Sequence, residues 1–174
     1  MSRYRILLSA LLALFWVSAV AAEESMRIHV DINAITSTED LQPVDGLTSA
    51  GQPNRQQFEL IAAAGYAAVI DLRGENEDRG LDEAAVLEEL GLDYVVLPLS
   101  SPEAINMDNA RLLDDILADY DEPVLVHCGS GNRVGALLAL RASLRGADDA
   151  EALAYGKSAG LTGLEPVVRK RLED

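Results

Sequence analysis

The sequence predicts a single α/β domain in which a mainly parallel central sheet is flanked by helices. Short apolar segments of strand length alternate with segments of helical periodicity, and no internal repeat, low-complexity tract or linker interrupts the alternation. The chain has 174 residues, which suits one domain, and its hydrophobic share of 49% is ample for a packed core.

The expected elements follow from capping residues and apolar patterns. A first helix opens at Pro53-Asn54, because Asn54 can cap it, Gln57 stands three residues later, and Gly65 suits its end. Two helices near the C-terminus are expected at the capping-box pairs Asp148/Glu151 and Thr162/Glu165. Strands are expected at 66–72, 92–99 and 123–126. Further helices are expected at 82–90, 112–120 and 133–145.

The N-terminus has the pattern of a secretory signal peptide over residues 1–22. Arg3 and Arg5 precede an apolar stretch, and small residues lead to a cleavage site after Ala21 or Ala22. The alternative is an uncleaved membrane anchor, but the apolar stretch is short for a span of ~20 residues. We therefore expect a periplasmic or secreted protein without stable membrane association after cleavage. Residues 23–46 are expected to form an N-terminal strand or leader, and residues 47–174 the main domain.

Composition excludes several classes of function. The net charge of −15 argues against binding nucleic acid or anionic lipid through a broad basic surface, and an aromatic share of 5% leaves too few rings for a base-stacking platform. A single cysteine forms no internal disulfide, and no Cys/His cluster has the spacing of a zinc site. We expect neither a metal nor a cofactor, and the sequence carries no indication of an oligomeric state.

The segment PVLVHCGSGNRVGALLAL carries the chemistry of this sequence. A buried strand ends at His127-Cys128, a glycine-rich loop follows, and Arg133 opens a helix. Ligands of α/β sheets bind beyond the carboxyl ends of strands, and backbone N–H groups at a helix N-terminus attract anions. The same positive end favours a thiolate at Cys128, while the guanidinium of Arg133 matches two oxygens of a phosphate-like anion.

Each of these residues also has a purely structural interpretation. Cys128 can be a small buried hydrophobe, Gly131 a turn residue and Arg133 a surface helix residue. Their order after a strand and before a helix favours the functional interpretation. For His127 two roles stay open: hydrogen bonding to the thiolate, or a satisfied position at the end of the strand.

The loop HCGSGNRVG resembles the signature loop of cysteine-dependent tyrosine and dual-specificity phosphatases. The stretch TSAGQPNRQQFELIAAAGYAAVIDLRGENE and the later AGLTGLEPVV are similar to the bacterial beta-lactamase hydrolase-like phosphatase-like domains. The resemblance runs from about residue 47 to residue 145. It implies a cysteine-phosphatase-like fold for the main domain.

The resemblance also implies a mechanism and a set of site residues. Cys128 would attack phosphorus to give a phosphocysteine intermediate, and Arg133 with the loop amides would stabilise the equatorial oxygens. Glu103 and Asp108 are the candidates for the general acid, although either can equally be a solvated carboxylate. From the resemblance and from the position of the two strand ends together, the predicted substrate, a phosphorylated or other oxyanionic molecule, would contact Gly129, Ser130, Gly131, Asn132, Arg133, His127, Asp71 and Arg73.

Three departures from the tyrosine-phosphatase pattern keep other functions open. The loop has four residues between Cys128 and Arg133 instead of five, Val134 replaces the usual Ser or Thr, and the general acid has no clear equivalent. Cys-x4-Arg and VIDLRGENE also resemble rhodanese sulfurtransferases, in which a cysteine persulfide needs no general acid. A third possibility is a non-catalytic domain that binds an anion.

Charged residues after the strand at 66–72 are expected near the same cleft. Asp71 and Arg73 flank it, and Arg73 is expected mainly to hold the loop through an ion pair. Glu77 and Arg79, with their neighbours, are expected to form a solvated turn.

Overall fold

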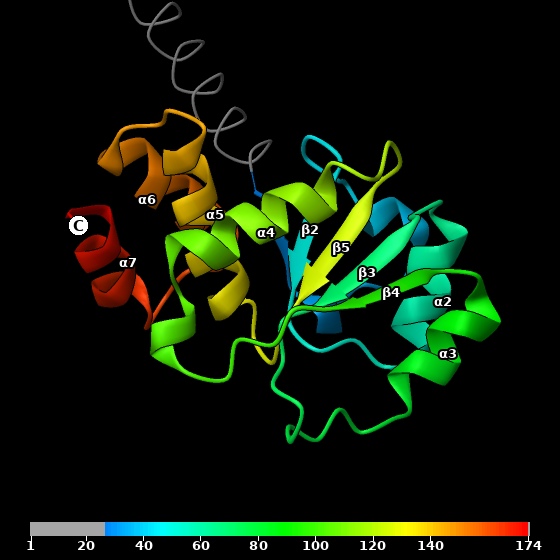
Figure 1. The fold of residues 1–174 in the computed structure, drawn as a ribbon. Coiled ribbons are helices and arrows are strands. Elements are labelled where there is room, and N and C mark those ends of the chain that lie inside the picture. Colours follow the sequence, from blue (N-terminus) through cyan, green and yellow to red (C-terminus); the bar gives the residue numbers. More distant parts are fainter. Residues whose placement is uncertain (1–26, 174) are drawn as a thin grey trace, which may run out of the picture.

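The computed structural model describes residues 27–173, in which five strands form one parallel sheet. The order is β1-β2-β5-β3-β4, so β5 lies at the centre between β2 and β3 (Figure 1). The mainly parallel sheet predicted from the sequence is thereby confirmed. The strands are β1 (His29–Val30), β2 (Leu47–Ala50), β3 (Ala68–Asp71), β4 (Asp93–Val96) and β5 (Val124–His127).

Helices cover both faces of the sheet. Helices α2 and α3 lie on one face, and α4, α5, α6 and α7 lie on the other (Figure 1). Their bounds are α2 (Arg55–Ala63), α3 (Glu83–Leu90), α4 (Met107–Leu117), α5 (Asn132–Leu144), α6 (Asp149–Ser158) and α7 (Glu165–Glu173). Short 3-10 turns occupy Ile32–Ala34, Thr38–Asp40 and Pro102–Ala104.

Side chains of the central strand alternate between two apolar cores. Val124 and Val126 pack with the helices α4 to α7, whereas Leu125 packs with α2 and α3. This period of two is the geometry of any β-strand, and both faces are apolar because both are covered. The alternation continues through the end of β5, where it decides which side of the sheet each functional residue reaches.

Two capping predictions are confirmed, and one helix is shifted. Asn54 accepts from the Gln57 N–H, and Asp148 accepts from the Glu151 N–H, each in a reciprocal capping box. The helix expected at 112–120 runs instead from Met107 to Leu117, because the Asn106 side chain caps it by accepting from Asn109 N–H at 2.9 Å.

The strand β2 is the element that the sequence analysis does not predict. Its residues Leu-Thr-Ser-Ala are few and include two hydroxyl side chains, yet all four are buried. Thr48 Oγ1 lies 2.5 Å from the hydroxyl of Tyr66, and Ser49 Oγ donates to the Ala159 carbonyl at 2.7 Å. Because each hydroxyl has a partner, burial of these polar groups is tolerated.

The signal peptide expected at 1–22 lies outside the described residues. Within 27–173, no helix is long and apolar enough to cross a membrane. The short strand β1 pairs with β2 at one edge of the sheet, and Ile28 just before it is buried in the core shared with α4 to α7.

Two glycines allow α5 and α6 to cross at close range behind the sheet. A Cβ at Gly135 of α5 would overlap the backbone of Leu161 and the carbonyl of Gly156, and a Cβ at Gly156 would lie 2.7 Å from Ala139 Cβ. This crossing fixes the body of α5, whose N-terminus carries the glycine-rich loop.

We predict that Gly135→Ala destabilises the protein by about 1–3 kcal/mol, because the methyl group has to displace backbone rather than a flexible side chain. Urea unfolding measures the change. Gly163→Ala is the control, since its Cβ would meet only Asn132 Nδ2 at 3.7 Å. Equal stability of the two variants would contradict the close crossing.

Candidate functional site

The cysteine lies where β5 passes into α5. The Cys128 N–H donates to the Ala50 carbonyl at 3.3 Å, which ties the start of the loop to β2. The Gly131 N–H donates to Cys128 Sγ at 3.1 Å, and the cysteine is 1% exposed. The sulfur thus faces the positive N-terminal end of a 13-residue helix, which favours negative charge there.

Gly131 is required by the shape of this loop. It adopts a left-handed conformation with φ 81° as the N-cap of α5, and a Cβ there would overlap the ring of His29. His29 Nδ1 lies 3.3 Å from Ser49 Oγ, and burial lowers the pKa of His29. At neutral pH a neutral His29 ring therefore packs against Gly131 of the loop.

Arg133 is clamped by a glutamate from another part of the chain. Its Nη1 and Nη2 donate to the two carboxylate oxygens of Glu77 at 2.5 and 2.7 Å, and Nη1 also donates to the Leu99 carbonyl at 3.2 Å. These contacts use the end of the guanidinium. The edge formed by Nε and the second Nη2 hydrogen is left facing the loop, where Nη2 would lie 3.7 Å from a Cβ at Gly129.

The charges of Arg133, Glu77 and Cys128 depend on one another. Hydrogen bonding to Glu77 raises the pKa of Arg133 although burial opposes it, and the Cys128 sulfur contributes in the same direction. In return, Arg133 lowers the pKa of Glu77 to about 2, with help from the Gly74 N–H and Arg73. Both members of the ion pair are therefore charged at neutral pH.

The solvated turn expected around Glu77 and Arg79 is wrong for these two residues. Glu77 binds Arg133 and also Arg73, whose Nε lies 3.2 Å from Glu77 Oε2. The Arg79 side chain is 16% exposed, and its Nε lies 2.6 Å from Asp71 Oδ2. Arg133 is 56 residues from Glu77, and the sequence alone does not show that Asp71 and Arg73 turn toward this segment, so only the fold brings these charges together. The expected structural role of Arg73, holding a loop through an ion pair, agrees with its contact to Glu77.

His127 and Asp71 lie on the other face of the sheet from Cys128. Successive residues of a strand point to opposite faces, so His127 points toward α2 and α3, where its ring meets Phe58 edge-on at 6.3 Å. His127 Nε2 lies 2.7 Å from Glu83 Oε1, and both His127 and Asp71 are 0% exposed. The structure does not bring either side chain to the anion-facing side of the loop, and their role in substrate binding stays a prediction.

Asp71, Glu83 and His127 form the one group in the described chain with the spacing of metal ligands, their ligand atoms lying within 4.8 Å of one another. Arg79 already supplies positive charge to Asp71 at 2.6 Å, and the Tyr94 hydroxyl donates to the same carboxylate at 3.0 Å. Since these partners occupy the carboxylate, the donor set is an ion-pair network, and we assign no metal to it.

The two candidate acids lie on the segment that follows β4. Asp108 is in the first turn of α4, where its side chain is 94% exposed and contacts Arg111 at 2.9 Å. Glu103 is exposed in the 3-10 turn Pro102–Ala104, and hydrogen bonding to Ser101 lowers its pKa. Neither carboxylate has a hydrogen bond or ion pair to Cys128 or Arg133 among residues 27–173.

The remaining loop residues divide between anchoring and exposure. Asn132 Oδ1 accepts from the N–H groups of Thr162 and Leu164 at 2.8 and 3.3 Å, which ties the start of α5 to the segment before α7. Gly129 and Ser130 follow Cys128, and Ser130 is exposed and bridges to Gly51. A cavity of about 280 Å³ opens beside Arg133 and is lined by Leu99, Ser100, Ser101, Pro102, Ile105, Asn132, Arg133 and Leu164.

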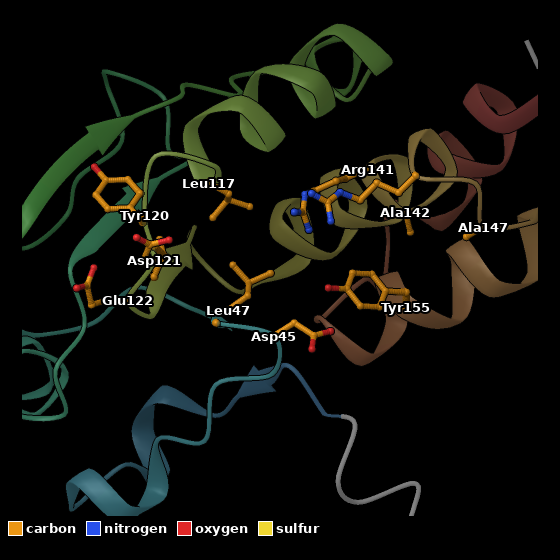
Figure 2. A pocket seen from close by; sticks show the side chains of 13 residues that line it. Asp45, Leu47, Leu117, Tyr120, Asp121, Glu122, Arg141, Ala142, Ala147 and Tyr155 are labelled. Atoms are coloured by element: carbon orange, nitrogen blue, oxygen red, sulfur yellow. The ribbon is translucent and has the colours of Figure 1, made fainter.

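A larger cavity, of about 390 Å³, lies at the opposite, amino-terminal ends of the strands. It is formed where β2 and β5 begin and where α4 and α5 end, with Leu47 and Leu117 between Asp121 on one side and Arg141 on the other (Figure 2). Since Cys128 follows the carboxyl end of β5, this cavity is separate from the Cys128 loop.

Comparison with known proteins agrees with this geometry. Residues 24–162 match the model of a family described as DSP-PTPase phosphatase fused to NAD+ kinase. The chain belongs to this family. Its fold is that of tyrosine-phosphatase-like cysteine phosphatases, as the resemblance in the sequence implied.

Three relatives illustrate the match. A beta-lactamase hydrolase-like protein of Xylella fastidiosa (strain 9a5c) is 34% identical over 137 residues, covering 75% of this chain and 29% of the relative. The crystal structure of a protein from Shewanella putrefaciens CN-32, described as a DUF442 phosphatase, has a TM-score of 0.58 at 24% identity; the match covers 79% of this chain and 93% of the Shewanella chain. P. aeruginosa TpbA, in complex with pTyr, has a TM-score of 0.53 at 20% identity and covers 75% and 86%.

The curated relatives are longer proteins. This chain spans between 24% and 29% of their length. The match therefore covers one segment of each relative.

We predict that the Glu77–Arg133 ion pair makes stability fall with acid in a defined range. Because the pKa of Glu77 is lowered to about 2 in the fold, its contribution is complete above the unfolded value of about 4.3 and is lost as the pH falls toward about 2. Glu77→Gln should therefore be less stable than wild type at neutral pH, with the difference shrinking across that range.

Urea unfolding at a series of pH values measures this difference. Glu75→Gln, at an exposed neighbouring carboxylate, is the matched control and should follow wild type throughout. A difference between Glu77→Gln and wild type that stays constant down to about pH 2 would show that the ion pair does not stabilise the fold.

Proposed function

We propose that this chain is a cysteine-dependent phosphoric monoester hydrolase. One observation carries the proposal: Cys128 Sγ accepts the Gly131 N–H at the start of α5, and the free edge of Arg133 faces the same loop. Transfer of a phosphoryl group requires a nucleophile, backbone N–H groups that face the phosphate, and a cation that can bind two of its oxygens.

The reaction proceeds in two displacement steps. The Cys128 thiolate attacks phosphorus, a sulfur–phosphorus bond forms, and the bond between phosphorus and the leaving oxygen breaks with its electron pair going to that oxygen. Water then attacks the phosphocysteine, giving inorganic phosphate and regenerating the thiolate. Throughout, the loop N–H groups and the Nε–Nη2 edge of Arg133 bind the equatorial oxygens. Glu77 holds the far end of the guanidinium so that this edge stays oriented.

The substrate is a phosphomonoester on a protein or a small molecule. The resemblance to P. aeruginosa TpbA, whose structure contains pTyr, supports an aryl phosphate as one form of it. A net charge of −15 disfavours polyanions through long-range repulsion, although salt screens this beyond about 8–10 Å. The pattern of residues 1–22 supports export to the periplasm or beyond as part of this proposal.

A sulfurtransferase is the second candidate, and two observations favour it. The loop has only four residues between Cys128 and Arg133, and within residues 27–173 neither Glu103 nor Asp108 has a hydrogen bond or ion pair to Cys128 or Arg133. A persulfide on Cys128 passes its outer sulfur to an acceptor without protonating an oxygen leaving group, so no general acid is needed.

The decisive prediction concerns Cys128→Ser. Wild-type protein should release phosphate from p-nitrophenyl phosphate, and the substitution should abolish turnover because a serine hydroxyl is a far weaker nucleophile than a thiolate. Arg133→Lys should lower kcat/KM by about 10²-fold or more, because the ammonium cannot bind two oxygens side by side.

The same preparations are assayed with thiosulfate plus cyanide. Thiocyanate formation that depends on Cys128, without phosphate release, would replace the phosphatase by the sulfurtransferase. Oxyanion binding without either activity would leave an anion-binding domain. Turnover that survives Cys128→Ser would exclude this site altogether.

A separate prediction tests the general acid. If Glu103 or Asp108 protonates the leaving oxygen, then Glu103→Gln or Asp108→Asn should slow hydrolysis of phenyl phosphate by about 10²-fold or more, and slow p-nitrophenyl phosphate much less, because p-nitrophenolate leaves without protonation. Glu39→Gln, at a distant exposed position, is the control. Equal and small effects on both substrates would remove both carboxylates from the mechanism.

A further inference from the structure

Five hydrogen-bonded contacts connect the two ends of the Cys128 loop through residues outside it. They begin at His127, directly before the cysteine: its Nε2 lies 2.7 Å from Glu83 Oε1, and Glu83 Oε2 accepts from Gln52 Nε2 at 2.9 Å. Gln52 Oε1 accepts from Arg73 Nη1 at 2.5 Å. Arg73 Nε donates to Glu77 Oε2 at 3.2 Å, and Arg133 Nη2 donates to the same oxygen at 2.7 Å.

Gln52 is the neutral link in this chain. Its carbonyl oxygen faces the Arg73 guanidinium and its amide nitrogen faces the Glu83 carboxylate, so the charges on either side permit only one orientation of the amide. Arg79 also lies between these residues, since its Nη2 donates to the Arg73 carbonyl at 3.2 Å and its Nε lies 4.0 Å from Glu83 Oε2. Gln52 differs from Arg79 in that it contacts the Arg73 guanidinium itself. Gln52 therefore connects the buried His127–Glu83 pair, on the α2–α3 face of the sheet, to Arg73 and through it to the Glu77–Arg133 ion pair.

The backbone of Gln52 is also held against the loop. The preceding Gly51 bridges Ser130, and a Cβ at Gly51 would lie 3.3 Å from the Gly129 carbonyl. The Gln52 backbone therefore has little room to move. If the Gln52 side chain is displaced, Glu83 or Arg73 has to move with it.

We propose that Gln52 is a positioning residue for Arg133, acting through Arg73 and Glu77 and anchored by Glu83 and His127. The proposal rests on the proposed function in taking Arg133 as the group that binds the substrate oxyanion. Gln52 does not touch the oxyanion. It fixes the position of Arg73 and Glu77, and Glu77 holds Arg133 so that the Nε–Nη2 edge of Arg133 faces the loop.

Gln52→Glu provides a pH-dependent test of this role. The substitution keeps an oxygen for Arg73 but places a second oxygen against Glu83, so the contact forms only while one proton is shared between the two carboxyl groups. Arg73 and Glu83 face the new carboxyl directly. Arg79, His127 and Glu77 contact one of these two residues, and Asp71 and Tyr94 lie beyond Arg79. Because two carboxylates are brought together, the shared proton should be retained above the ordinary carboxyl range of about 4.

The experiment measures sulfate binding by calorimetry and the rate at which iodoacetamide alkylates Cys128, from about pH 5 to about pH 8. Sulfate keeps a constant charge over this range, and Cys128 is the single thiol of the chain. Gln52→Glu should bind sulfate with nearly wild-type affinity at the acid end and about fivefold more weakly at the alkaline end, the loss expected for one hydrogen bond. Its alkylation rate should depart from wild type over the same pH interval.

Two further variants separate positioning from packing. Gln52→Met has similar length without hydrogen-bonding groups and should show the weaker sulfate affinity at every pH. Gln42→Glu alters an exposed glutamine whose amide donates to the Glu39 carbonyl, and should follow wild type.

The outcomes are distinct for the inference and for the proposed function. A pH-dependent loss of sulfate affinity in Gln52→Glu that is absent from wild type and from Gln42→Glu supports the positioning role, even if wild type hydrolyses no phosphomonoester. If Gln52→Glu and Gln52→Met both match wild type, or both lose the same affinity at all pH values, the positioning role is wrong. Where sulfate binding is too weak to measure, the pH profile of alkylation decides by the same criteria.

Discussion

The alternation of side chains at the end of β5 is the constraint on which the site depends. His127 and Cys128 are neighbours in sequence, yet they point to opposite faces of the sheet. The histidine reaches the buried network under α2 and α3, and the cysteine reaches the N-terminus of α5. The sheet thus separates the sulfur from the buried carboxylates of Asp71 and Glu83, and leaves it next to helix N–H groups and Arg133.

The arrangement of charge around the loop follows from the same separation. Although the chain has a net charge of −15, Arg133 and the first N–H groups of α5 place positive charge beside the Cys128 sulfur. Glu77 partly neutralises Arg133, but it binds the end of the guanidinium and leaves the edge that faces the loop. A carboxylate so close to an anion site consequently orients the arginine without occupying the position of the substrate.

Membership of a phosphatase-like family narrows the chemistry without deciding the leaving group. The overall fold is shared with the solved phosphatase-like structures, although sequence identity is 20–24%. The short loop and the exposed positions of Glu103 and Asp108 are features of this chain. They concern protonation of the leaving atom. Hydrolysis of a phosphate ester needs this step for its leaving oxygen, whereas transfer of sulfur from a persulfide does not.

The sequence by itself determines the order of strands and helices around the loop and the convergence of Cys128, Gly131 and Arg133. These features depend on residues close together in the chain, whose caps, glycines and apolar periods act locally. Only the tertiary structure decides that Glu77, 56 residues away, clamps Arg133, and that the hydroxyl-bearing β2 lies beside β5. Both outcomes depend on partners distant in sequence, because a charge or hydroxyl is buried only where the fold supplies its counterpart.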